Sequence, residues 1–300
     1  MSRGTLKVQC GGKKGGAVRR KTTRDAAWVL PVLGAVSVLV GAAVLGLPGH
    51  GHGHAGGSTA SRSNGRGQAT ASSTSSLLYD SERPPANQKS APDPHLPAPV
   101  VSMDIAHASD KGTHAVNITI DDGPDPVWTP RVLQVLKDDG VKAVFCMIGE
   151  EAAGYPAVVR QVVADGHRLC DHSLHHDTTM GRKPPSYQYS EIVNAKGEIE
   201  RASGGVKPLY YRAPGGAFTP YSRQIAASIG MRPLGWNIDA RDYKRSGALT
   251  IVTTVEHELP NGPTILFHDG GGDRSQTVAA LAALLPRLRQ QGYAFGFPVR

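Results

Sequence analysis

Acidic residues are almost absent from the first 25 residues, which contain eight basic residues and only Asp25 as an acid. This segment therefore carries +7 of the chain's net charge of +8, and the other residues together carry about +1 (8 − 7). A basic excess confined to one end does not indicate a nucleic-acid-binding surface, and we expect no nucleic-acid partner. We interpret residues 1–25 as a basic cytoplasmic tail that flanks a membrane segment.

Charged residues are missing from the next stretch, Ala26 to Leu47, which is built mainly from Ala, Val, Leu and Gly. At about 1.5 Å per residue, a helix of this length crosses a hydrocarbon core of about 30 Å. Because basic residues stay on the cytoplasmic side, we expect residues 26–48 to anchor the protein with its N-terminus inside and the rest outside the cell. A cleaved signal peptide is the alternative, and it would make the protein secreted; the long apolar run favours the anchor.

Large apolar residues are rare from Gly49 to about Pro99, where Gly, Ser, Thr, His and Pro dominate. Such a composition buries too little surface to offset the entropy cost of ordering the chain. We predict a disordered linker over residues 49–109 and a folded catalytic domain over residues 110–300.

Cysteine is also scarce, and only Cys146 and Cys170 fall in the part predicted to be exported, where a disulfide is permitted. Both lie in predicted strands that could be neighbours. Because a bridge between neighbouring parallel strands is geometrically demanding, the sequence leaves this disulfide open.

Residues 110–300 alternate between short β-branched runs and amphipathic segments. The predicted strands are 115–120, 142–148, 167–170, 209–211, 231–238 and 264–267. The predicted helices are 128–139, 156–164, 186–202, 221–229, 251–259 and 276–290. This alternation indicates an α/β fold of parallel strands joined by crossover helices, which a barrel or an open sheet would both satisfy.

Polar residues follow five of these strands. In a parallel barrel the loops after the strands lie on one face, so we expect the five loops to converge on one site. They are Asp121–Asp122, His172–His176, Arg212–Gly216, Asp239–Tyr243 and His268–Asp269.

Two histidines and a carboxylate could hold a metal ion at this site. His172 and His176 are four residues apart, so on a helical turn their rings would share one face. With Asp122 they would form a ligand set that leaves positions open for water and substrate, as in catalytic zinc sites. His172 with His175 is a second possible pairing. Adjacent carboxylates on a strand point to opposite sides, so Asp121 would be left for a different task.

That task could be proton transfer. A metal-bound water has a pKa near 7, and Asp121 could accept its proton as the water attacks a carbonyl. His268 could donate a proton to an amide leaving group, with Asp242 orienting the ring and keeping it charged. Arg212 could lower the pKa of Asp121 or form a structural salt bridge.

In these motifs the chain resembles the polysaccharide deacetylases of the NodB-homology type, carbohydrate esterase family four. The likeness covers about Thr113 to Val299 and contains five family motifs in order. Four positions depart from the usual pattern: Ile120 replaces Phe, Gly215 stands where an aromatic residue is common, Tyr243 replaces a groove-lining Trp, and Ile265 replaces Leu.

The resemblance implies a distorted (β/α) barrel and a divalent metal ion, usually zinc, on Asp122, His172 and His176. It also implies Asp121 as the base and His268 as the acid. Substrate would contact Pro214, Gly215 and Tyr243, with the Gly215 backbone N–H forming part of an oxyanion site.

The expected function is a membrane-tethered, metal-dependent deacetylase that removes N-acetyl groups from an acetylated glycan polymer outside the cytoplasm, with peptidoglycan as the first candidate. Chitin oligomers, another exopolysaccharide and O-acetyl xylan are alternative substrates. A non-catalytic glycan-binding module and a metal hydrolase acting on a non-sugar amide are alternatives of a different kind. The sequence does not predict the oligomeric state.

Overall fold

The computed structural model describes residues 93 to 300. The predicted tail, the predicted membrane anchor and most of the predicted linker lie outside the described residues. Within residues 93–300, no helix is both long enough and apolar enough to cross a membrane.

The centre of the fold is one sheet of eight parallel strands in the order β5-β4-β3-β2-β1-β7-β6, with β8 beside β1. Strands β5 and β6 end this order and are not paired with each other in the described part of the chain, so the barrel is not fully closed. The parallel α/β prediction is confirmed. The strands are β1 (Ala115–Asp121), β2 (Ala143–Met147), β3 (Arg168–Asp171), β4 (Tyr210–Tyr211), β5 (Arg232–Pro233), β6 (Ile238–Asp239), β7 (Thr264–His268) and β8 (Ala294–Phe295).

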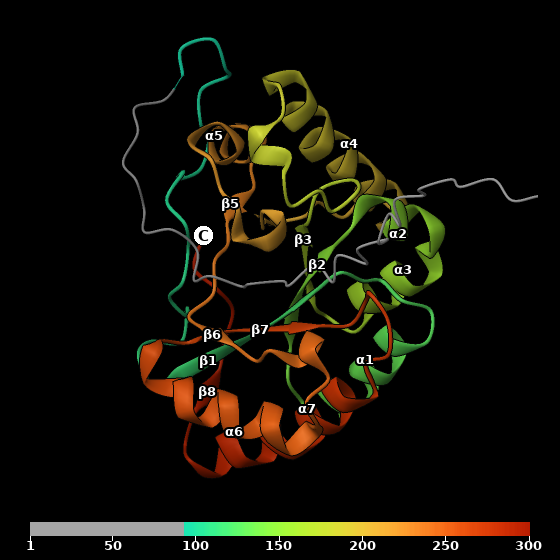
Figure 1. The fold of residues 1–300 in the computed structure, drawn as a ribbon, viewed down its shortest axis with the longest axis vertical. Helices are drawn as coiled ribbons and strands as arrows, with labels where there is room; N and C mark the ends of the chain where they lie inside the picture. Colours follow the sequence, from blue (N-terminus) through green and yellow to red (C-terminus); the bar gives the residue numbers. More distant parts are fainter. Residues whose placement is uncertain (1–92) are drawn as a thin grey trace, which may run out of the picture. The chain divides into compact units, whose positions relative to one another are not determined.

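Helices cover the outside of the sheet (Figure 1). Successive neighbours pack against one another around it: α6 on α7, α7 on α1, α1 on α3, α3 on α4, and α4 on α5. The helices are α1 (Trp128–Asp138), α2 (Gly149–Gly154), α3 (Pro156–Ala164), α4 (Pro185–Ser203), α5 (Pro220–Ser228), α6 (Ala248–Glu258) and α7 (Ser275–Gln290). Four short 3₁₀ turns join them: η1 (Met180–Arg182), η2 (Pro214–Gly216), η3 (Asp242–Lys244) and η4 (Leu259–Asn261).

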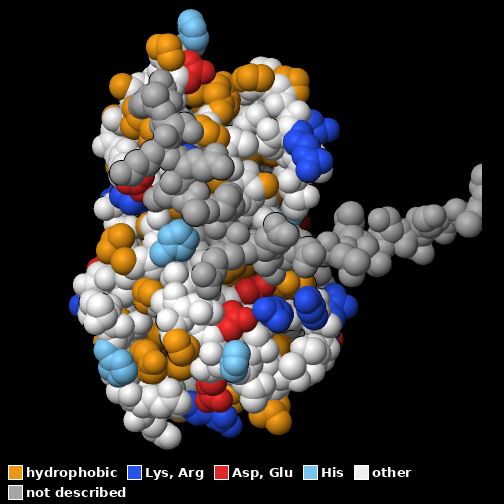
Figure 2. All heavy atoms as spheres, turned by 60° about the vertical axis from the view of Figure 1, so that its left-hand side comes forward, with side chains coloured by type: hydrophobic (Ala, Val, Ile, Leu, Met, Phe, Trp, Pro, Cys, Tyr) orange, Lys and Arg blue, Asp and Glu red, His pale blue; other side chains and the backbone are white. Residues whose placement is uncertain are grey.

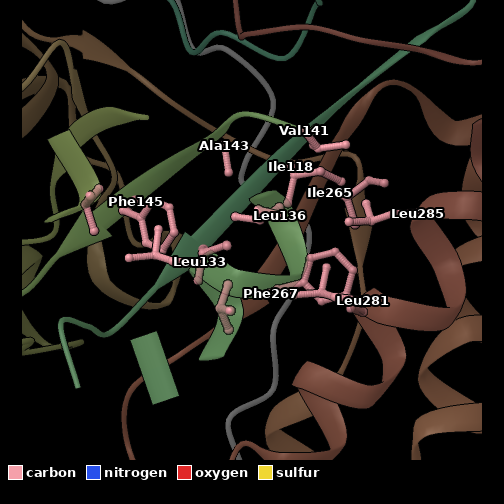
Figure 3. Packing of buried hydrophobic residues seen from close by; sticks show 14 of the residues in the cluster. Ile118, Leu133, Leu136, Val141, Ala143, Phe145, Ile265, Phe267, Leu281 and Leu285 are labelled. Carbon is pink, nitrogen blue, oxygen red and sulfur yellow. The ribbon is translucent and has the colours of Figure 1, made fainter. Parts of the chain in front are cut away.

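The main core lies between the central strands and the helices (Figure 3). Side chains alternate along a strand, so in β1 the apolar Ile118 and Ile120 join this core, whereas Asn117, Thr119 and Asp121 belong to the opposite face. The polar members of β1 are buried and bonded to partners inside the barrel. The alternation thus places the last of them, Asp121, at the carboxyl end of the barrel.

One predicted strand is wrong. The segment 231–238 is two short strands, β5 and β6. The Leu234 N–H still donates to Tyr211 of β4, but the carbonyls that follow β5 do not bind a neighbouring strand of the sheet. The carbonyls of Leu234 and Gly235 accept hydrogen bonds from Arg212 at 3.1 and 3.0 Å, and Gly235 N–H donates to Ala106. Helix α2 and strand β8 were not predicted.

The packed domain also begins earlier than the predicted boundary at residue 110. Ile105 and Ala106 are buried, and the Ala106 N–H donates to the carbonyl of Pro233 at 2.8 Å. Further upstream, the side chain of Gln224 on α5 bonds to both the N–H and the carbonyl of Asp93. Residues 93–109 therefore belong to the fold rather than to a disordered linker.

Cys146 and Cys170 form a disulfide between β2 and β3. The two residues are direct register partners in the parallel sheet, so the bridge that the sequence left open is present. Both cysteines are buried.

Basic and acidic side chains lie in small separate groups on the face shown in Figure 2. A broad single-sign field is the usual feature of a polyanion-binding surface. The visible face has no such feature outside the parts drawn in grey.

Candidate active site

Asp121 and Asp122 lie at the end of β1. The strand ends at Asp121, and Asp122 adopts a left-handed backbone conformation with φ of 75°. As a result the two carboxylates do not point to opposite sides as expected: one oxygen of each lies 3.5–3.6 Å from Nε2 of His172. Gly270 lets this turn form, because a Cβ there would lie 2.1 Å from the Asp122 carbonyl oxygen.

The two histidines come from the loop after β3. This loop is not a helical turn, which corrects the expectation; instead, Ser173 and His176 have left-handed φ values of 66° and 55°. The fold of the loop brings the rings of His172 and His176 to a centroid distance of 4.8 Å. His175 is not part of this ligand group. Its Nδ1 instead lies 2.5 Å from a carboxylate oxygen of Glu191 on α4.

Asp122, His172 and His176 can share one metal ion, since one ligand atom from each lies within 4.8 Å of the others. The Nδ1 of His172 bonds to the Arg212 carbonyl at 2.8 Å, which makes Nδ1–H the donor and leaves Nε2 as a lone-pair ligand. Burial lowers the pKa of His172 to about 3, so its ring is neutral. Buried Oδ1 of Asp122 and Nε2 of His172 have no hydrogen-bond partner in residues 93–300, as expected for atoms that bind an ion.

Arg212 and Asp121 form a buried ion pair. Nη1 of Arg212 donates to Oδ1 of Asp121 at 2.6 Å, and Nη2 donates to the hydroxyl of Thr119 at 3.0 Å. The arginine side chain is fully buried. Burial raises the pKa of Asp121, the charges of Arg212 and His268 lower it, and the balance lies above the usual value. The pair holds the carboxylate in place and stops burial from raising its pKa further.

His268 and Asp242 form the second buried pair, at the carboxyl end of β7. One Asp242 oxygen lies 2.7 Å from Nδ1 of His268, and the other accepts the His268 backbone N–H at 2.9 Å and the Thr277 hydroxyl at 2.7 Å. Burial lowers the pKa of His268, but the charge and hydrogen bond of Asp242, together with the charges of Asp122 and Asp121, outweigh burial and raise the pKa to about 9. Burial alone would raise the pKa of Asp242, and the charged ring holds it below its usual value. At neutral pH the imidazole is therefore a charged acid.

Of the three predicted substrate contacts, Tyr243 lies beside the second pair, and Pro214 and Gly215 follow Arg212 of the first pair in the chain. The Tyr243 ring meets the His268 ring edge-on at a centroid distance of 5.4 Å. Pro214 and Gly215 follow Arg212 in η2, where Gly215 has a φ of 60°. A Cβ on Gly215 would touch Cγ2 of Thr178 at 3.4 Å, so η2 packs against the histidine loop.

Three polar residues that support this site have no role predicted from the sequence. Asp269 accepts the Thr129 hydroxyl at 2.6 Å, and its N–H donates to the Asp121 carbonyl; burial raises its pKa to about 7. Thr119 holds Arg212, and Thr277 holds Asp242. Asp269 could have been suspected from its place next to His268, and Thr119 from its place on the polar face of β1. Thr277, on a helix, carries no such signal.

The arrangement thus has a ligand group for a metal ion, a buried carboxylate beside it, and a charged imidazole on the neighbouring strand β7, where His268 is the register partner of Asp121. Comparison with known proteins identifies the family. Residues 108–234 match the family described as polysaccharide deacetylase. The chain is 38% identical over 183 residues to the peptidoglycan-N-acetylglucosamine deacetylase of Bacillus cereus, covering 60% of this chain and 84% of that protein. The chain belongs to the polysaccharide deacetylase family.

Other members support this membership. A chitooligosaccharide deacetylase of Bradyrhizobium sp. is 36% identical over 193 residues, covering 61% of this chain and 88% of that protein. The crystal structure of a peptidoglycan N-acetylglucosamine deacetylase in complex with 4-naphthalen-1-yl-N-oxidanyl-benzamide has a TM-score of 0.61 and 28% identity, covering 64% of this chain and 90% of that one. This polysaccharide deacetylase is therefore an enzyme, a hydrolase of the deacetylase class.

Proposed function

We propose that this polysaccharide deacetylase is a metal-dependent N-deacetylase of an amino-sugar polymer outside the cytoplasm. The proposal rests on two buried ion pairs at the site, Arg212 with Asp121 and Asp242 with His268. A carboxylate held by Arg212 and an imidazole held by Asp242 lie beside one ligand group. Amide hydrolysis needs both, because one proton must leave the attacking water and another must reach the departing nitrogen.

Asp122, His172 and His176 would hold the ion, and zinc suits two imidazoles and one carboxylate. When bound, a divalent cation supplies a Lewis acid that polarises a carbonyl and lowers the pKa of water. The fit rests on the buried Asp122 and His172 atoms that have no hydrogen-bond partner among the described residues.

Two side chains beside the ligand group would carry out the two proton transfers, one each. Asp121 accepts a proton from the attacking water, and Arg212 keeps that carboxylate oriented. His268 donates a proton from Nε2 to the amine leaving group, because Nδ1 is occupied by Asp242. The backbone N–H of Gly215 would bind the carbonyl oxygen as it gains charge. Tyr243 and Pro214 would position the sugar.

Peptidoglycan is the substrate that we favour. The Bacillus cereus relative is named for that activity, and the anchor predicted at residues 26–48 would hold the domain outside the membrane. A flexible linker over residues 49–92 would have a reach of about 40 Å, which suits a wall close to the membrane. Chitooligosaccharides are the second candidate, because the Bradyrhizobium relative is named for them.

The test is acetate release by the full-length protein with added zinc from peptidoglycan fragments, chitooligosaccharides and acetylated xylan. Release from peptidoglycan fragments, lost in an Asp121→Asn variant that still binds zinc, is the expected result. No release from any of the three while zinc is bound would refute the proposal and leave the glycan-binding module as the better reading. Release from xylan alone would refute the amide specificity.

A further inference from the structure

A hollow of about 440 Å³ lies next to the site. It is lined by residues of the histidine loop, of η1 and of the segment after η2, among them Thr178, Thr179, Arg182, Ala217 and Phe218. None of these residues has a part in the chemistry described above.

The hollow adjoins the reaction centre directly. Thr178 follows the metal-ligand candidate His176 by two residues, and Ala217 follows Gly215 by two. The position of a Cβ on Gly215 would be 3.4 Å from Cγ2 of Thr178, so the two segments touch where the oxyanion N–H is expected. A polymer bound with one acetamide at the reaction centre would therefore place a neighbouring sugar in or beside the hollow.

The lining has the character of a sugar site. Phe218 is half-buried and is braced by the ring of Tyr211, edge-on at a centroid distance of 6.0 Å. Thr178 and Thr179 are exposed and carry hydroxyl groups. A second hollow of about 290 Å³ shares Gly181 and Thr219 with the first, so the two continue one another.

The lining of the hollow includes one basic side chain, Arg182. Arg182 is exposed, and it forms none of the ion pairs found in residues 93–300. The acid on the same loop, Asp177, instead accepts the N–H and the hydroxyl of Thr179 at 2.8 and 2.7 Å. A guanidinium with free donors at the rim of a sugar-sized hollow suits a planar, bidentate carboxylate.

We propose that this hollow is a subsite for a carboxylate-bearing sugar next to the sugar that is deacetylated, and that Arg182 pairs with that carboxylate. The subsite rests on the proposed function and deepens it by naming the class of polymer. A muramic acid residue without a peptide stem carries a free lactyl carboxylate, whereas a residue with a stem has that carboxyl group in an amide bond. Every sugar of a chitooligosaccharide is neutral. Arg182 thus favours acidic glycans over neutral ones.

The experiment compares the full-length wild type with Arg182→Gln and Arg182→Lys, and with Arg287→Gln as a control that removes an arginine charge from helix α7. Two soluble ligands of equal length are used: a GlcNAc–MurNAc tetrasaccharide and a GlcNAc tetrasaccharide. Binding to zinc-free protein is measured by calorimetry at low and high salt, and acetate release is measured separately with zinc.

Arg182→Gln should weaken binding of the muramyl tetrasaccharide about 3- to 5-fold at low salt, less at high salt, and change binding of the neutral one less than 2-fold. Arg182→Lys should recover part of the loss, and Arg287→Gln should have no effect. Equal effects of Arg182→Gln on both ligands, or no effect on either, would overturn the subsite. Absence of acetate release by the wild type would instead overturn the proposed function, because the binding comparison does not depend on turnover.

Discussion

Replacing Asp242 by Asn removes the carboxylate that keeps His268 charged and leaves the shape of the side chain almost unchanged. In the wild type burial lowers the pKa of His268, but the charge and hydrogen bond of this carboxylate, together with the charges of Asp122 and Asp121, outweigh burial and raise the pKa to about 9. Without it, burial is the largest influence, and burial lowers the pKa. We therefore expect the pKa of His268 in Asp242→Asn to be at or below its ordinary value of about 6.5.

The size of the effect follows from this difference. A fall from about 9 to about 6.5 corresponds to about 3 kcal/mol. A general acid must be protonated, so activity is present below its pKa and is lost as the pH rises through it. At pH 7.5 nearly all wild-type molecules would have a protonated His268, against about a tenth of the variant molecules. The variant should therefore lose about tenfold or more in kcat/KM at that pH.

The assay is the pH profile of kcat/KM for acetate release with zinc, from pH 5 to pH 10. The alkaline limb should move to lower pH by about two units or more. A bound cation would lower the pKa of His268 in both the wild type and the variant. The quantity to compare is therefore the difference in pH between their alkaline limbs. Asp138→Asn, at the exposed end of α1, is the matched control and should leave the limb in place. An Asp242→Asn limb at the wild-type position would refute the assignment of His268 as the acid.

The same pair makes stability depend on pH. Because the folded pKa of His268 is raised, its contribution to the free energy of unfolding is fully present below about pH 6.5 and is lost as the pH rises through about 9. This dependence should be missing from Asp242→Asn in urea titrations. An unchanged dependence would show that another group causes it.

Three further predictions concern the supports of the site. Arg212→Met leaves the buried Asp121 carboxylate without its cation and should lower the free energy of unfolding by about 3–5 kcal/mol in urea titrations; a loss below about 1 kcal/mol would contradict the importance of the pair. Zinc at 100 times its Kd should stabilise the wild type by about 2.7 kcal/mol. His176→Ala should reduce this gain in thermal unfolding, and His175→Ala should keep it; equal loss in both would contradict the ligand assignment. Cys146→Ser opens a disulfide that spans 24 residues and should cost about 3 kcal/mol, so an unchanged urea midpoint would argue against the bridge.

Much of the candidate site could be predicted because short sequence patterns identify its residues. The alternation of Asn117, Thr119 and Asp121 with apolar neighbours assigns one face of β1 to the barrel interior. Polar residues directly after apolar runs predict loops on the carboxyl face, since parallel strands all end on that face. These patterns depend only on residues a few positions apart.

Other features depend on residues far apart in the chain, and only the tertiary structure decided them. The left-handed turn at Asp122 is shaped by Gly270, almost 150 residues later, and it brings both aspartates to one site. At the break between β5 and β6, the carbonyls of Leu234 and Gly235 bind Arg212 rather than a neighbouring strand. The sequence by itself therefore determined the parallel α/β plan and named most of the residues that the structure brings together at the candidate site. The direction of each carboxylate, the open barrel and the packing of residues 93–109 were decided by long-range contacts, whose partners no local pattern identifies.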